Sequence, residues 1–315
     1  MYAFRPAEAG PPAGAGPLHL RRVARRDFTG RPGAAAPGAD ELAFLDEYLS
    51  DLARPYGSPL RAEVLADGGA HRYEEMAEEL IAALVPPTDP VDVVVLAFAV
   101  PDVRAGRTVA TYRGHACPGD PLAFAVCDQG GAAPFAALRL VGELTRTGGC
   151  RRGLLLVVEQ PALAYQPAGP VVLPARPAAV GLLFGPAGPA RLVAHRQHPG
   201  IPADMLPARL AAELADLRAD AGETTLVLGG GLAGTPVDAL PVDRVRVAPA
   251  GQPGTGVWWG LADELAEAGA DPDPVAGPGT VPAPALDPVR RRLVLADHDT
   301  MLGYLCLAAF DVGRP

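Results

Sequence analysis

The chain has 315 residues, a formal net charge of −9 and 49% hydrophobic residues. This composition excludes a disordered chain, and the acidic balance argues against nonspecific nucleic-acid binding. No apolar run reaches the ~18 residues of a membrane-spanning helix, and the first residues carry no secretory signal pattern, so we expect a cytoplasmic protein. The sequence contains no lysine, which excludes Schiff-base chemistry, the phosphate-binding P-loop and protein kinase chemistry.

The cysteines and histidines do not follow metal-site or disulfide spacing. The four cysteines, at positions 117, 127, 150 and 306, form no CxxC pair. His195 and His198 lie three residues apart, but no acidic residue or cysteine accompanies them and Pro199 follows directly. We therefore expect no metal, no disulfide framework and no cofactor.

The first part of the chain alternates helical and strand patterns. Residues 1–40 are expected to be partly flexible, with one short strand at 18–23. Apolar spacing and apolar runs then predict helix 41–52, helix 71–85, buried strand 91–100, buried strand 123–127, helix 132–147 and buried strand 153–159. Two further apolar segments, 178–184 and 190–196, predict a hairpin across a Gly-Pro-Ala-Gly turn.

The remaining chain repeats this plan with helix 203–219, strand 224–228, strand 244–247, helix 255–268 and closing strands 292–296 and 302–310. The repeat predicts an α/β fold with two similar halves, 41–200 and 201–315, after the segment 1–40. Glycine turns at 130–131 and 251–254 precede matching helices. Each turn therefore places a helix N-terminus at the carboxyl edge of a sheet, where ligand sites form.

Four segments in this order resemble the ketoacyl synthase III-like branch of the thiolase superfamily. They are VDVVVLAFAVPD (91–102), the stretch from strand to strand around CDQGG (121–159), AGQPGTGVWWGLADEL (250–265) and RRLVLADHDTMLGYLCLAAF (291–310). The resemblance implies mixed, mostly parallel sheets in an α-β-α-β-α layering. It also implies acyl-CoA or acyl-carrier-protein ligands and a dimer that pairs across strand 123–127.

The family's condensation chemistry uses a Cys nucleophile at a helix N-terminus, assisted by a His and an Asn. In this sequence all three matching positions differ. The nucleophile position falls on Gly130 or Gly131, the His position falls within the Gly229–Gly231 run, centred on Gly230, and the Asn position falls on Gln252. Because glycine carries no reactive group, the resemblance implies that the usual condensation is absent.

Other residues near these turns are candidates for a rebuilt active site. Cys127 is either a displaced nucleophile or a small apolar residue at a strand end. Asp128 is either a base or a helix cap. His298, between Asp297 and Asp299, is either a general base or part of a solvated turn.

Two more residues are candidates for contact with substrate. His115 lies two residues before Cys117 in the loop that precedes strand 123–127. Gln129 lies in the turn at residues 128–131, which holds the family's nucleophile position and is named the nucleophile turn.

Three functions follow as hypotheses. The first is a non-condensing partner subunit of an active ketosynthase, as a homodimer or heterodimer, in natural-product or lipid biosynthesis. The second is an acyltransferase that uses thioester substrates through Asp128, His298 or Cys127. The third is a thioester-ligand binding protein. None involves nucleic acid or a membrane.

Overall fold

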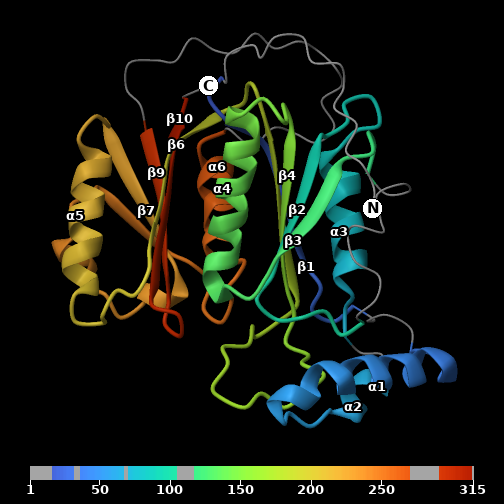
Figure 1. Cartoon of the computed structure of the whole chain (residues 1–315). Helices are drawn as coiled ribbons and strands as arrows, with labels where there is room; N and C mark the ends of the chain where they lie inside the picture. The colour runs from blue at the N-terminus through green and yellow to red at the C-terminus, as the bar shows by residue number, and fades with distance from the viewer. Residues whose placement is uncertain (1–15, 32–35, 67–69, 105–116, 270–290, 314–315) are drawn as a thin grey trace.

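The computed structural model describes residues 16–31, 36–66, 70–104, 117–269 and 291–313. Its strands follow one order, β3-β2-β4-β5-β1-β6-β10-β9-β7-β8. In the middle of that order, β1 (His19–Asp27) and β6 (Ala190–His198) pair at only two positions, through Leu20 and its neighbour. The ladder therefore divides at this seam into two five-stranded sheets (Figure 1).

The first sheet consists of β1, β2 (Val93–Ala97), β3 (Leu122–Val126), β4 (Gly153–Glu159) and β5 (Ala178–Gly185). The helices of this half are α1 (Ala39–Ala53), α2 (Ala62–Ala66), α3 (Tyr73–Leu84) and α4 (Ala133–Arg146). The second sheet consists of β6, β7 (Glu223–Leu228), β8 (Arg244–Val247), β9 (Arg291–Asp299) and β10 (Tyr304–Val312). Its helices are α5 (Leu206–Arg218) and α6 (Gly256–Glu267).

The two halves share one topology. In the first, β3, β2 and β4 run parallel, and β5 runs antiparallel to both β4 and β1. In the second, β8, β7 and β9 run parallel, and β10 runs antiparallel to both β9 and β6. By this order β6 is the first strand of the second half, although the sequence boundary at residue 200 places it in the first.

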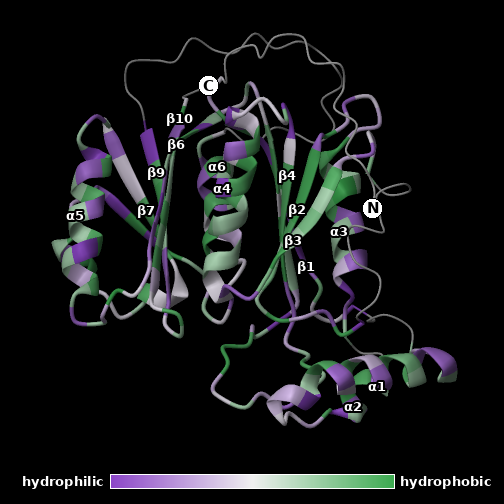
Figure 2. Cartoon of the chain, viewed as in Figure 1, coloured by the Kyte–Doolittle hydropathy of each residue, from purple (hydrophilic) through white to green (hydrophobic). Residues whose placement is uncertain are grey.

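The sheets and helices form five layers (Figure 1). Helix α3 packs on one face of the first sheet, α5 packs on one face of the second, and α4 and α6 lie between the two sheets. Helix α3 packs on the sheet through one apolar face, because its buried residues, from Tyr73 to Leu84, recur at intervals of three and four positions. Figure 2 shows the matching hydrophobic strands between helices that carry polar residues on their other faces.

The structure corrects three expectations about strands. Segments β5 and β6 do not form a hairpin, because β1 is inserted between them. Strand β1 is longer than the predicted 18–23, and it belongs to the first sheet rather than to a flexible segment. Strand β3 is half-exposed rather than buried, because it occupies an edge of the sheet and has a neighbouring strand, β2, on one side only in the described order.

Helices α1 and α2 lie apart from the layers and pack with the loop that follows β4 through a small cluster around Leu49, Leu65 and Ala164. Among the described residues, none of the helices combines the length and the hydrophobicity that crossing a bilayer requires.

Candidate functional site

The candidate site lies where the parallel strands end. The turn after β3, the turn after β7 and the end of β9 come together there, since β9 contacts both the short 3-10 helix at Gly130–Ala132 and the one at Gly230–Leu232. The carboxyl edge of both sheets thus brings together two of the turns that the sequence singles out. The third, around Gln252, lies beside the first, since the carbonyl of Pro253 is close to Gly131.

The nucleophile turn is closed by a carboxylate from β9. Asp128 has φ of 60° and Gly130 has φ of 50°, so the chain turns sharply before α4 begins. The backbone N–H of Gly131 donates to Asp299 Oδ2 at 2.6 Å. A Cβ atom on Gly130 would overlap that same oxygen. Asp299 therefore occupies the space that a nucleophilic side chain at Gly130 would need.

The second turn is closed in the same way by Asp297. Its Oδ1 accepts from the backbone N–H of Gly231 at 3.0 Å and of His298 at 2.8 Å. A Cβ atom on Gly229 would overlap the Asp297 carboxyl group. Burial raises the pKa of Asp297 to about 7, with Asp299 and Glu159 adding repulsion. The space beside Gly229 is thus filled by a carboxyl group that takes up protons near neutrality.

The third turn, around Gln252, is held by Glu159 at the end of β4. Gln252 Nε2 donates to Glu159 Oε1 at 2.6 Å, and the backbone N–H groups of Gly254 and Thr255 donate to the same carboxylate at 2.8 and 3.0 Å. Burial raises the pKa of Glu159, although these donors counteract it. Glu159 therefore fixes the start of α6 and engages the amide nitrogen of Gln252.

His298 does not share the site with its two neighbours. Because side chains alternate along a strand, Asp297 and Asp299 lie on the face that β9 turns toward α4 and α6, and His298 lies on the other face. The His298 ring is 8% exposed, and its Nε2 atom has no hydrogen-bond partner among the described residues. Burial lowers the pKa of the ring, although Asp299 counteracts this effect.

Cys127 and Asp128 lie beside the nucleophile turn. The Cys127 thiol donates to Asp128 Oδ2 at 3.4 Å, and burial together with that carboxylate raises the pKa of the thiol. A reactive thiolate needs the opposite environment. Asp128 and Gln129 are both exposed, and neither donates or accepts a side-chain hydrogen bond that would cap α4.

Two other groups that the sequence analysis names remain to be placed. His115 falls outside the described residues, so its position relative to this centre is not described. His198 lies near Glu213 Oε1 at 3.0 Å and hydrogen-bonds to Arg209 on the α5 side. In the described ranges, no group of three His, Cys, Asp or Glu side chains is arranged to hold a metal ion.

In each of the three turns, a backbone N–H group thus donates its hydrogen bond to a carboxylate of the same chain. Asp299, Asp297 and Glu159 accept the N–H groups of Gly131, Gly231 and Gly254 that face them. Sequence reasoning did not assign these acceptor roles, and it considered the two aspartates only as neighbours of His298. A signal was present: the Asp-His-Asp motif stands where the resembled family has a glycine-rich loop.

Comparison with known proteins shows where such a fold occurs. No sequence-family model and no curated protein sequence matches the chain. The acyltransferase ChlB3 superimposes with a TM-score of 0.55 at 15% identity, over 95% of this chain and 98% of ChlB3. A variant of OleA from Xanthomonas campestris gives a TM-score of 0.53 at 11% identity, over 94% of this chain and 98% of OleA. A second OleA variant, with bound lauric acid and lauroyl-CoA, gives a TM-score of 0.53 at 14% identity, over 95% of this chain and 99% of that OleA chain.

These matches span both halves of the chain. The chain has a thiolase-like fold. The repeated halves and the α-β-α-β-α layering predicted for this thiolase-like chain are confirmed. At identities of 11–15%, the likeness establishes the fold, and the activity has to be argued from the site.

A cysteine placed in the nucleophile turn tests the role of Asp299. Gly131 accepts a Cβ atom, whose nearest neighbours would be Pro253 O at 3.3 Å and Asp299 Oδ2 at 3.7 Å. We expect the thiol of Gly131→Cys to react slowly with iodoacetamide, because the adjacent carboxylate disfavours the thiolate. Adding Asp299→Asn should accelerate alkylation at least about tenfold at pH 7.5. Equal rates in the two variants would contradict this role.

Proposed function

We propose that this thiolase-like chain is a non-condensing partner subunit of an active ketosynthase-like enzyme in lipid or natural-product biosynthesis. The observation that carries the proposal is the closure of the nucleophile and His turns by Asp299 and Asp297. Condensation needs a nucleophile and free donors for the enolate or acyl oxygen. Here the nucleophile position is glycine and the donor of Gly131 is occupied.

The fold around the closed turns remains well packed, which supports a role in shape or docking. Phe135 on α4 packs against Trp258 on α6, with ring centroids 5.0 Å apart, and both side chains are fully buried. A subunit that pairs with a relative of the same fold must keep its overall shape, and this packing maintains that shape.

Strand β3 is the proposed interface with the partner. It forms one edge of the sheet order, and its sequence LAFAV is apolar although Leu122 and Ala125 are exposed. The opposite edge, β8, reads RVRV and carries arginines, which discourage edge-to-edge pairing. Of the two terminal strands in the described sheet order, β3 is therefore the less protected. We expect a homodimer, or a heterodimer with a ketosynthase-like subunit, to pair there.

The test begins with the intact-protein mass after incubation with acetyl- to lauroyl-CoA, on the native chain and on Cys127→Ala. We expect no acyl adduct on either. An adduct that disappears in Cys127→Ala would contradict the proposal and make the protein an enzyme with a displaced nucleophile.

The second arm co-expresses the chain with a condensing enzyme and compares the condensation rate of the pair with that of each subunit alone. A stable complex whose activity depends on both chains supports the proposal. A homodimer with turnover of its own contradicts it.

A second candidate function is acyl transfer without a covalent intermediate, favoured by the exposed carboxylate of Asp128 in the turn and by the likeness to the acyltransferase ChlB3. Release of free CoA in the presence of an acceptor, lost in Asp128→Ala or in His298→Ala, would establish it. An acyl-CoA that stays bound and unchanged, with no partner subunit, would instead indicate a thioester-binding protein.

A further inference from the structure

Strand β1 has a free edge in the middle of the fold. On one side it pairs with β5 from His19 to Asp27. On the other side its pairing with β6 ends at Leu20, where a β-bulge interrupts the strand. From Arg21 to Asp27 this second side has no neighbouring strand among the described elements. Backbone groups that face an unpaired edge are available to another strand.

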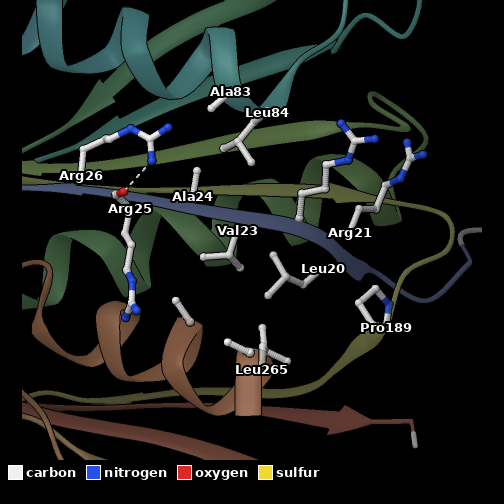
Figure 3. Close-up of a pocket in the computed structure, with 13 residues that line it drawn as sticks. Leu20, Arg21, Val23, Ala24, Arg25, Arg26, Ala83, Leu84, Pro189 and Leu265 are labelled. Carbon is white, nitrogen blue, oxygen red and sulfur yellow. Dashed lines mark hydrogen bonds between the residues drawn. The ribbon is translucent and has the colours of Figure 1, made fainter. Parts of the chain in front are cut away.

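The hydrogen bonds show which groups face the free edge. The backbone N–H of Phe28 donates to Pro177 O on the β5 side. Because the backbone N–H and C=O groups of alternate residues point to the same neighbouring strand, those of residues 24 and 26 also point toward β5. Residues 23, 25 and 27 then face away from β5. The carbonyl of Arg25 agrees, since it accepts a hydrogen bond from the side chain of Arg26 instead of from a strand (Figure 3).

A cavity of about 310 Å³ runs along this edge, lined by every residue from Leu20 to Arg26. Its remaining walls are apolar and come from the end of α3, from Pro189 and from α6, with Leu84 and Leu265 on opposite sides of the strand (Figure 3). The edge is therefore a groove with an apolar floor rather than a flat surface.

The groove is basic although the chain is acidic. Four arginines lie within β1, and three have carboxylate partners: Arg21 with Asp89, Arg25 with Asp263 and Arg26 with Glu79. Within the described ranges, no ion pair joins a carboxylate to the partly exposed Arg22. The edge also carries one carboxylate, Asp27, which pairs with Arg176. Each of the three partner carboxylates is shared with a further arginine, Arg152, Arg246 or Arg31, so the edge is positive. A second β1 strand would be repelled, whereas an acidic strand would be attracted.

We propose that the free edge of β1, from Arg21 to Asp27, binds an extended acidic peptide segment of a partner protein by strand addition. The segment would exchange backbone hydrogen bonds with residues 23, 25 and 27 and place carboxylates beside the arginines, with Arg22 as the one that lacks a partner in the described chain. The inference does not depend on whether the thiolase-like site is catalytic.

The experiment measures the binding of synthetic eight-residue peptides to the full chain by fluorescence anisotropy. The first peptide alternates Glu and Val, the second replaces each Glu by Lys, and two further Glu-Val peptides carry N-methyl groups on one or the other set of alternate residues. We expect saturable binding of the Glu-Val peptide and none of the Lys-Val peptide. One N-methyl set should weaken binding at least about tenfold and the other should not, because only one edge of the peptide pairs with β1.

Two protein variants complete the test. Arg22→Ala should weaken the binding of the Glu-Val peptide several-fold. The control variant Arg146→Ala, which replaces an exposed arginine on α4, should leave its binding unchanged. No binding of any peptide would overturn the proposal, as would equal effects of the two N-methyl sets. Dodecanoate that binds to the same cavity while the peptides do not would also overturn it, since the groove would then accept an anionic amphiphile instead of a strand.

Discussion

Gly231→Ala should unfold this protein or destabilise it by about 4 kcal/mol or more. A Cβ atom at this position would overlap the backbone carbonyl oxygen of His298, and the Asp297 Oδ1 atom lies 3.1 Å from it. A backbone atom inside a β-strand cannot rotate away as a flexible side chain can. The 3-10 turn after β7 would therefore have to separate from β9 and lose the hydrogen bond from Gly231 to Asp297.

The neighbouring residue provides a matched control. Gly230 belongs to the same turn, but a Cβ atom there would meet nothing within 4 Å and its φ is not in the left-handed region. We expect Gly230→Ala to change the free energy of unfolding by less than about 1 kcal/mol. Urea unfolding followed by the fluorescence of the buried Trp258 measures both variants. Similar stabilities for Gly231→Ala and Gly230→Ala would show that β9 does not pack against this turn as described.

The stability of the native chain should fall with pH relative to Asp297→Asn. The pKa of Asp297 is about 7 in the folded chain against an ordinary value of 3.8, so its protons are held more tightly in the folded state. Folding is then favoured below pH 4, and this contribution is lost as the pH rises through 7. At ~1.4 kcal/mol per pKa unit, the loss amounts to about 4 kcal/mol.

Asparagine keeps an acceptor oxygen for the N–H groups of Gly231 and His298 but cannot ionise. The difference in unfolding free energy between Asp297→Asn and the native chain should therefore increase by several kcal/mol, in favour of the variant, between pH 4 and 8. Denaturant titrations at half-unit pH intervals measure it. The two chains differ at position 297 alone, so the comparison reports on that carboxyl group. A constant offset over this range would mean that Asp297 is ionised in the folded state at all these pH values.

These two experiments also bear on function. If Asp297 and Asp299 hold the turns together, the carboxylates are part of the folded core and are not free to act on a substrate. The absence of a nucleophile at Gly130 and Gly131 would then be matched by a structural replacement, which favours the non-condensing role.

Much of the fold was predictable from local sequence pattern. Apolar runs such as VVVLA in β2 and GLLLVVE in β4 fit only strands covered on both faces, and both strands are fully buried. The spacing in α3 and α4, and the glycine turns before α4 and α6, gave helix positions within a few residues of the observed ones. The order of these elements was enough to predict the repeated halves.

The site was predictable only in part. Sequence order placed Gly130, Gly230 and Gln252 at the turns where the resembled family has its reactive groups, and the structure brings the turns of the two glycines together at β9. It did not predict that Asp297 and Asp299 would face these turns, with His298 on the other side, because the facing of a strand depends on the register of β9 with β7 and β10.

What the sequence determined by itself is the position of most helices and strands and of the glycine turns between them, because periodicity and residue identity are local properties. What only the tertiary structure decided is the insertion of β1 between β5 and β6, the free edge that results, and the closure of the turns by β9. Each of these depends on contacts between segments 66 or more residues apart, such as Asp297 with Gly231, Asp299 with Gly131 and β1 with β5.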